Sequence, residues 1–66
     1  MRDLITVRDM NGILRLYAAG TIFGYTGWDY KGRRIADLPD RDAAWKWAAQ
    51  QATRLELPAP MAEEFL

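Results

Sequence analysis

The sequence predicts a small α+β domain: a meander of three or four antiparallel β-strands, with one C-terminal amphipathic α-helix packed on one face of the sheet. Three observations support this fold class. Apolar residues alternate with other residues in the first half, glycine-containing turns interrupt that alternation, and the second half has a capped segment with helical periodicity. A chain of 66 residues holds one domain, which we assign to residues 1–57, with residues 58–66 as a short C-terminal tail.

The first two strands are predicted to form a hairpin. Residues 4–8 alternate, and the Asn-Gly pair at residues 11 and 12 is the strongest short-range hairpin signal in the chain. A two-residue turn sets Val7 opposite Leu16, whereas a four-residue turn sets Val7 opposite Leu14. Both registers keep one apolar face, so the sequence predicts the hairpin and leaves its register open.

A third strand is predicted over residues 21–30. It follows the second strand, residues 13–19, across a short link at residues 19 and 20. Pairing across this link brings Leu16 near Phe23, on the same face as the apolar residues of the first strand. We therefore expect Phe23 to belong to the core.

A fourth, short strand is predicted over residues 33–38. The segment Asp-Tyr-Lys-Gly at residues 29–32 repeats the pattern of Asp-Met-Asn-Gly at residues 9–12, which indicates a second turn. With a two-residue turn, Trp28 lies opposite Ile35, and both residues lie on the face away from the apolar one. A bulge in the third strand would return them to the apolar face, and the sequence leaves this choice open.

The glycines within the third strand raise the question of a phosphate-binding loop. The stretch GYTGWDYKGRR lacks the spacing of a Walker loop, and it lacks the GxGxxG fingerprint of dinucleotide-binding folds. Bulky aromatic residues between the glycines favour a β-strand instead. We expect Gly24 and Gly27 to mark a bulge, a sharp twist or a place where a neighbouring element packs closely.

The helix is predicted over residues 41–57. Asp40 is a good N-cap, and a proline ends the segment. One narrow apolar stripe comprises Ala44, Ala48, Ala52 and Leu55, with Trp45 and Trp47 on its two shoulders. Small alanines would let the helix lie close to the sheet. The tail that follows either frays or docks through Met61, Phe65 and Leu66.

The composition excludes several chemistries. The chain has no Cys and no His, and its sequence contains no Ser, so disulfides, thiolate or imidazole metal sites and serine or histidine triads are excluded. Asp40 and Asp42 could ligate Mg²⁺, but the start of a helix explains them more simply. We predict that the protein is not an enzyme and has no cofactor and no metal site.

Charge and hydropathy bear on partners and location. Nine acidic residues balance nine basic ones, so no overall field attracts nucleic acid or an anionic membrane. The charged N-terminal segment does not resemble a signal peptide, and no run approaches the roughly 20 apolar residues of a membrane span. These features predict a cytoplasmic protein with no membrane partner.

A single helix covers only one face of a sheet, and the other face is the best functional indication. That second face is predicted to carry Leu4, Thr6, Arg8, Arg15, Tyr17, Ile22, Thr26 and Trp28. Tyr, Trp and Arg are enriched at the centres of protein interfaces, which favours a partner surface or self-association. The alternative is a plain solvated face, because antiparallel sheets often leave one side wet.

The only basic cluster is predicted at the second turn. It comprises Lys31, Arg33 and Arg34, with Arg41 nearby. The cluster could contact phosphate or an acidic protein surface. The alternative interpretation is a charged hairpin tip whose basic side chains pair with Asp29 and Asp37. Together the two regions define the candidate partner-binding residues: Arg8, Arg15, Tyr17, Ile22, Trp28, Lys31, Arg33 and Arg34.

Residues 13–52 resemble the arm-binding domain at the N-terminus of tyrosine recombinases, in which a three-stranded sheet plus a helix enters the DNA major groove. The resemblance rests on an aromatic strand, the turn DYKGRR, a short strand and a capped helix with DAAWKWA. Gly32, Arg33 and Arg34 match the turn glycine and the basic residues of that family, and Ala44 with Trp45 or Trp47 matches its helix. The resemblance implies DNA contact by sheet residues such as Arg8, Arg15 and Arg33.

The competing expectation is a stand-alone protein-binding module. The chain is similar in size and build to small phage-encoded inhibitors of host defence, including anti-CRISPR proteins. That similarity implies binding to, and occlusion of, a host protein or protein complex. Zero net charge favours protein over DNA as the main ligand, because phosphate contacts supply much of DNA affinity. We therefore predict a non-enzymatic protein-interaction module of this inhibitor kind. A DNA-binding domain of the recombinase type is the alternative, and a homo-oligomer is a further expectation.

Overall fold

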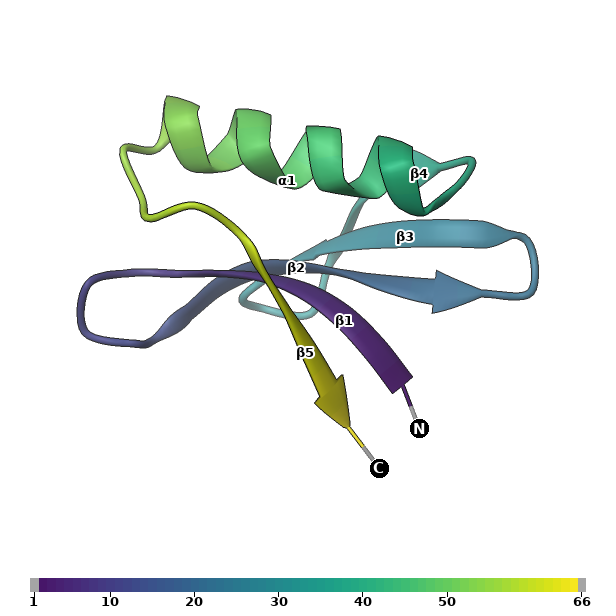
Figure 1. The fold of residues 1–66 in the computed structure, drawn as a ribbon, viewed down its shortest axis with the longest axis horizontal. Coiled ribbons are helices and arrows are strands. Elements are labelled where there is room, and N and C mark those ends of the chain that lie inside the picture. Colours follow the sequence, from purple (N-terminus) through teal and green to yellow (C-terminus); the bar gives the residue numbers. More distant parts are fainter. Residues whose placement is uncertain (1, 66) are drawn as a thin grey trace.

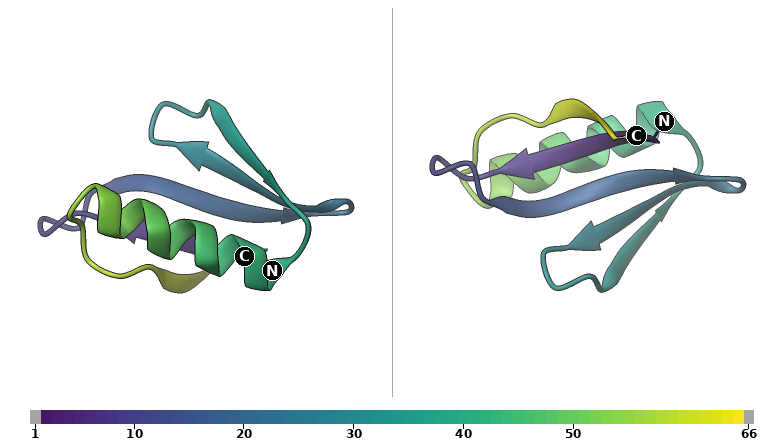
Figure 2. Two further views of the ribbon diagram at one scale, coloured as in Figure 1. Left: turned by 90° about the horizontal axis from the view of Figure 1, so that it is seen from above. Right: turned by 90° about the horizontal axis from the view of Figure 1, so that it is seen from below.

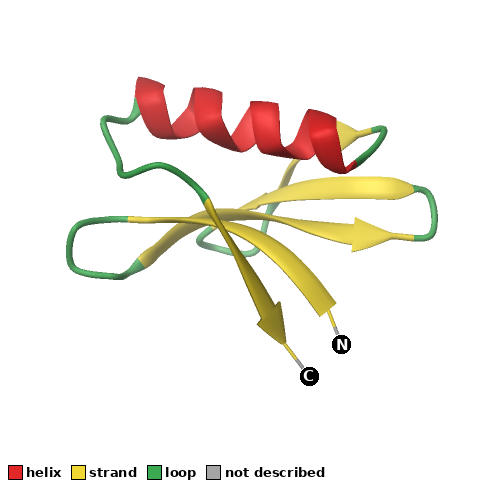
Figure 3. Cartoon of the chain, in the orientation of Figure 1, coloured by secondary structure: helices red, strands yellow, loops and turns green. Residues whose placement is uncertain are grey.

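The computed structural model describes residues 2–65, and in this range five strands form one antiparallel sheet with a helix on one face (Figures 1 and 3). The order of strands across the sheet is β4-β3-β2-β1-β5. The elements in chain order are β1 (Arg2–Arg8), β2 (Leu14–Thr21), β3 (Gly24–Asp29), β4 (Arg34–Leu38), α1 (Arg41–Arg54) and β5 (Met61–Phe65). The α+β fold with one helix on the sheet is therefore confirmed.

The fifth strand changes the predicted fold in two ways. The sheet has five strands where we expected three or four, and the helix is followed by a strand instead of being the last element. The segment expected to be a short tail docks along the free edge of β1, with Thr6 opposite Met61 and Leu4 opposite Glu63. Alternation in this segment is weak, so β5 forms because β1 offers it an edge rather than because of its own pattern. Leu66 lies outside the described residues.

The β1–β2 hairpin has the register that sets Val7 opposite Leu16 and Ile5 opposite Ala18. Its connection is not a two-residue turn, because Asp9 N–H donates to the Ile13 carbonyl at 3.0 Å and Gly12 N–H donates to the Asp9 carbonyl at 2.9 Å. This pattern is a three-residue loop closed by a glycine bulge, with φ of +81° at Gly12. Arg8 lies opposite Leu14, so a register shift between Val7 and Arg8 leaves Arg15 as an extra residue of β2 and restores the pairing of Val7 with Leu16.

The predicted β2–β3 link was wrong. The strands turn at Ile22 and Phe23 instead of at residues 19 and 20, so Leu16 pairs with Asp29 and not with Phe23. Phe23 is 89% exposed and lies outside the core. The two apolar residues gave a strand-like pattern, but Thr21 favours a turn, because its hydroxyl accepts from Phe23 N–H and donates to the Gly24 carbonyl, each at 3.2 Å.

The β3–β4 hairpin repeats the loop of the first hairpin. Asp29 N–H donates to the Arg33 carbonyl, Gly32 N–H donates to the Asp29 carbonyl, and Gly32 has φ of +80°. The predicted pairing of Trp28 with Ile35 was wrong, because Trp28 lies opposite Arg34. A register shift between Gly27 and Trp28 leaves Ile35 as the extra residue, so the bulge lies in β4. Trp28 stays on the face away from the helix.

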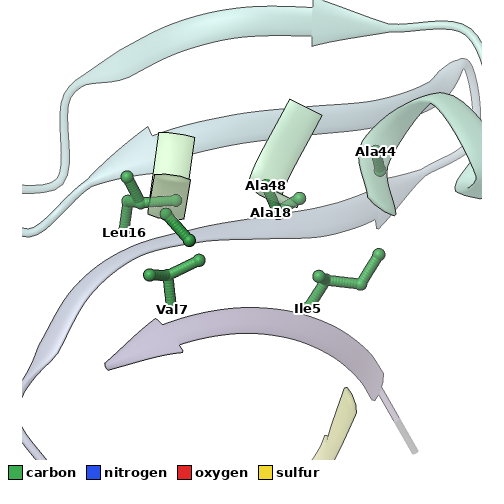
Figure 4. Packing of buried hydrophobic residues seen from close by; sticks show 7 residues of the cluster. Ile5, Val7, Leu16, Ala18, Ala44 and Ala48 are labelled. Atoms are coloured by element: carbon green, nitrogen blue, oxygen red, sulfur yellow. The ribbon is translucent and has the colours of Figure 1, made fainter. Parts of the chain in front are cut away.

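The helix begins at Arg41 as predicted but ends at Arg54 rather than at residue 57, because Leu55 is its C-cap and Glu56 has a positive φ of 57°. The Asp40 carboxylate accepts a hydrogen bond from Ala43 N–H at 2.8 Å, which caps the first turn. Three alanines of α1 lie fully buried over four apolar residues of β1 and β2 (Figure 4). The cluster comprises Ile5, Val7, Leu16, Ala18, Ala44, Ala48 and Ala52. Leu55 is an exception to the predicted stripe: it caps the C-terminus of α1 and is 46% exposed.

Two tryptophans flank the alanine stripe. Trp45 and Trp47 are half-buried and pack against the core cluster, as predicted. The alanines allow the close approach, and the indoles fill the space at the two sides of the helix.

Among the described residues, no helix is long and apolar enough to cross a membrane.

Candidate interaction surface

The sheet face opposite α1, which we call the open face, has no covering element among residues 2–65. Seen from below in Figure 2, β1 and β2 lie in front of the helix and nothing crosses them. Seen from above, the β3–β4 hairpin extends to one side of α1. The open face follows from the strand registers: it carries Leu4, Thr6, Arg8, Tyr17, Ala19, Thr26, Trp28, Arg34 and Asp37. Arg15 is the extra residue at the bulge of β2, near the end of this face.

The open face has a packed layer of its own. Thr6, Ala19 and Thr26 are at most 8% exposed although the helix lies on the other side of the sheet. Larger neighbours on the same face must therefore cover these small residues. Thr6 was expected to be an open surface residue, and its near-complete burial corrects that expectation. The result is a platform of closely packed side chains on this face.

Tyr17 and Trp28 form the aromatic centre of this platform. They lie opposite each other on β2 and β3, and their rings stack with centroids 6.4 Å apart and an angle of 16° between the planes. Both side chains are half-buried. A cross-strand aromatic pair of this kind loses little conformational freedom on binding, because its rotamers are already restricted.

Two arginines flank the aromatic pair. Arg34 lies opposite Trp28 on β4, its side chain is 65% exposed, and its Nε lies 4.0 Å from Asp37 Oδ1. Arg15 is the extra residue at the bulge of β2, two positions before Tyr17; its side chain is 44% exposed, and its Nη1 lies 4.0 Å from Asp9 Oδ2. These long, solvent-exposed pairs are weak, so both guanidinium groups can turn to a partner at little cost.

Arg8 has a structural partner instead. Its Nε and Nη2 donate to the two carboxylate oxygens of Glu63 on β5, at 2.8 and 3.1 Å, and its Nη1 donates to the Gly12 carbonyl at 3.0 Å. The Thr6 hydroxyl also donates to the Glu63 carboxylate. A bidentate pair of this geometry is stronger than an ordinary surface pair, and here it joins β5 to β1.

The same contacts shift two pKa values. Hydrogen bonds from Arg8 and then from Thr6 lower the pKa of Glu63 below its ordinary value, and they outweigh the opposing effect of desolvation. The hydrogen bond to Glu63 raises the pKa of Arg8. Both shifts favour the charged forms, so the pair is an anchor for the last strand rather than a group held ready for proton transfer.

The basic cluster at the β3–β4 turn is partly neutralised. Arg33 Nε lies 3.4 Å from Asp29 Oδ2, and the Lys31 ammonium lies 5.6 Å from the centre of the Tyr30 ring. Asp29 also accepts hydrogen bonds from the backbone N–H groups of Arg33 and Lys31, each at 2.9 Å. The backbone bond from Arg33 is the main reason that the pKa of Asp29 is lowered. Asp29 thus organises the turn and pairs with one of its basic residues.

Ile22 does not lie on the open face. It forms the tip of the β2–β3 turn together with Phe23 and is 90% exposed there. The structure therefore brings Tyr17, Trp28 and Arg34 together and places Lys31 and Arg33 at the adjacent turn. It places Arg15 at the bulge of β2 and separates Ile22 from both groups. Sequence reasoning missed Glu63 as the partner of Arg8, since nothing local in the sequence indicates that the C-terminal segment returns to β1.

The residues that the structure describes contain no group of three acidic side chains able to hold a metal ion. No protein family, curated protein or solved structure matches the chain. The geometry of the open face is therefore the main basis for a functional proposal.

Proposed function

We propose that this protein is a non-enzymatic protein-binding module and that the open face is its contact surface. The observation that carries the proposal is the stacked Tyr17–Trp28 pair, half-buried at the centre of a face that no element covers. Aromatic residues and arginine dominate the binding energy of protein interfaces, and they do so from the centre of the contact. Arg15 and Arg34 supply the flanking hydrogen-bond donors.

The charge of the chain supports a protein partner. The chain has zero formal net charge, and Arg33 and Arg34 each have an acidic neighbour. Binding driven by phosphate contacts would instead favour an excess of unpaired basic residues. The size and build are similar to those of small phage-encoded inhibitors of the anti-CRISPR kind, so we propose occlusion of a host protein surface as the mode of action.

DNA binding through the same face is the second candidate. It is favoured by one arrangement: β2, β3 and β4 with α1 form a three-stranded sheet plus helix, and Arg34 belongs to the sheet face that the helix leaves free. This is the arrangement that the resemblance to recombinase arm-binding domains implies. Affinity for DNA would fall steeply with salt, whereas a contact centred on an aromatic pair would not.

The proposal is tested by affinity capture with tagged protein from host-type lysate, washed at low and at high salt. We expect a stoichiometric protein partner that survives high salt, is lost with Tyr17→Ala and Trp28→Ala, and is retained by Phe23→Ala. Phe23 is the matched control, since it is an exposed aromatic residue away from the open face. Captured nucleic acid that washes off with salt would support the second candidate. Equal capture by all variants would contradict the use of the open face.

A further inference from the structure

The sheet has two edge strands, and they differ in whether a second copy of the chain could pair with them. β4 and β5 are the outer strands in the order β4-β3-β2-β1-β5. An edge strand presents unpaired backbone donors and acceptors, which is a template for pairing with another strand. Natural proteins block such edges with charge, bulges or a covering element. The β4 and β5 edges differ in the charges that they carry.

The β5 edge is blocked by like charges. The strand Met61–Phe65 contains Glu63 and Glu64 next to each other and has no basic residue. Antiparallel pairing of two β5 strands would bring four carboxylates together at the centre of the contact, which is destabilising. Arg8 neutralises Glu63 only from the inner side, where β1 lies.

The β4 edge carries complementary charges on one face. Arg34 lies opposite Trp28 and Asp37 lies opposite Thr26, so both charged residues belong to the open face. Residues three apart in a regular strand would lie on opposite faces. The bulge at Ile35 interrupts this edge locally, but it leaves Arg34 and Asp37 on the same face, which is consistent with their ion pair of 4.0 Å. Both side chains are mostly exposed, at 65% and 77%.

We propose that β4 pairs with β4 of a second copy, antiparallel, about a two-fold axis between Ile35 and Ala36. In this register Arg34 of each chain lies opposite Asp37 of the other, so one symmetric contact contains two identical opposite-charge pairs. Ile35, which is 50% exposed in the single chain, lies next to Ala36 of the second copy. Pairs of this kind stabilise adjacent antiparallel strands.

The neighbouring registers are less favourable. A two-fold axis through Ala36 would set Asp37 opposite Ile35 and Arg34 opposite Leu38, which pairs each charge with an apolar side chain. An axis through Ile35 would set Asp37 opposite Arg33, which already pairs with Asp29. The proposed register is therefore the one in which the β4 charges satisfy each other.

Space around β4 is consistent with this contact. In Figure 2 the β3–β4 hairpin extends away from α1, and no element lies beyond β4. Residues of β4 are half-buried or exposed along the strand. Pairing would make one continuous sheet across both copies and join their two open faces.

A strand of five residues makes a small contact, so we expect a dissociation constant on the order of 0.1–1 mM, the range of weak, transient contacts.

The experiment is sedimentation velocity and equilibrium over a concentration series that reaches about 1 mM, the upper end of that range. We expect the wild type to move from its monomer mass of 7.6 kDa to twice that mass as concentration rises. Arg34→Asp and Asp37→Arg should each raise the dissociation constant about tenfold or more, because each places like charges opposite each other. Thermal unfolding of each variant establishes that it remains folded.

Two mixed-charge samples make the test specific for the register. The double variant R34D/D37R should dimerise as the wild type does, since its charges are exchanged and still complementary. An equimolar mixture of the two single variants should form a heterodimer, because the R34D copy presents two acidic residues at these positions and the D37R copy presents two basic ones. A wild type that stays monomeric throughout would overturn the proposal. So would dimers that persist in both single variants, which would point to another surface.

Discussion

The indole of Trp47 on α1 lies directly against the backbone of Gly27 on β3. A Cβ atom built on Gly27 would lie 2.5 Å from Cη2 and 2.7 Å from Cζ2 of the ring. Any side chain at this position would require the helix or the indole to move. The distance between helix and sheet is therefore set at this end by a glycine, as it is set over β1 and β2 by the alanine stripe.

We predict that Gly27→Ala lowers the free energy of unfolding by roughly 1–3 kcal/mol, because the added methyl group overpacks the contact with Trp47. Urea denaturation followed by circular dichroism measures the change. In the double variant G27A/W47L the smaller leucine leaves room for the methyl group. The two single losses should therefore not add, and strict additivity would contradict the close contact.

Replacement of the loop glycine is expected to lower stability by the same amount in both hairpins. Gly12 and Gly32 have φ of +81° and +80°, and a Cβ on either would meet nothing within 4 Å. Alanine at each position should cost about 1 kcal/mol from backbone strain alone, and asparagine should cost less because it tolerates this conformation. Thermal or urea unfolding measures both effects.

Gly20→Ala is the control for the loop glycines. Gly20 lies in β2, and a Cβ there would make ordinary contact with the Tyr25 ring at 3.5 Å. Its replacement should leave stability unchanged or slightly higher, because alanine has less freedom to lose on folding. If Gly20→Ala lowered the free energy of unfolding as much as Gly12→Ala, the loss at Gly12 could not be assigned to its positive φ.

Glu63 is expected to make stability depend on acidic pH. Its folded-state pKa is lowered from an ordinary value of 4.5 by Arg8 and Thr6, so the unfolded chain binds this proton more readily. The stabilisation is fully present above the ordinary pKa of 4.5 and is lost as pH falls through the lower, folded-state pKa. We predict that Glu63→Gln lowers the unfolding temperature by roughly a few degrees at neutral pH, and that this difference shrinks as the pH falls below the ordinary pKa of 4.5.

Glu64→Gln is the matched control for Glu63. Glu64 is exposed and lies beside Glu63 on β5. The control variant should unfold close to the wild type at neutral pH. Hydrogen exchange gives a second readout: Glu63→Gln should speed exchange at the amides of β5 before those of β2. Equal effects of the two substitutions would mean that overall charge, and not the Arg8 pair, holds the last strand.

Phe23 is predicted to be dispensable for stability. The aromatic side chain is 89% exposed at the β2–β3 turn, so Phe23→Ser should change the free energy of unfolding by no more than about 0.5 kcal/mol. A core phenylalanine would instead cost several kcal/mol when truncated. Chemical denaturation of this one variant therefore distinguishes the observed turn from the strand that the sequence pattern suggests.

Local chemistry explains the elements that could be predicted from the sequence. The Asp40 cap, the buried Ala44, Ala48 and Ala52, and the alternation of Ile5 and Val7 depend on neighbours a few residues away. The repeated Asp-x-x-Gly pattern also predicted both hairpin turns, and the structure gives them the same loop. Tyr17 and Trp28 share the face away from the helix, as the alternation predicted, and their role as a partner surface stays a prediction.

The errors arise where two local signals conflict. Ile22 and Phe23 have the composition of a strand, but the side-chain hydrogen bonds of Thr21 and the positive φ of +132° at Gly24 favour a turn. The bulge at Ile35 has no sequence signature of its own. Alternation alone could not determine it, since its effect is to move later residues of β4 to the other face.

The sequence by itself determined the helix, its cap, the two Asp-x-x-Gly loops and the apolar face that the helix covers, because these depend on contacts within a few residues. Only the tertiary structure decided the role of the last segment. Glu63 meets Arg8 and Thr6 across 55 and 57 residues of chain, and β5 exists because those partners and the edge of β1 are already in place. Pairing over such a distance depends on the completed sheet, which no local pattern encodes.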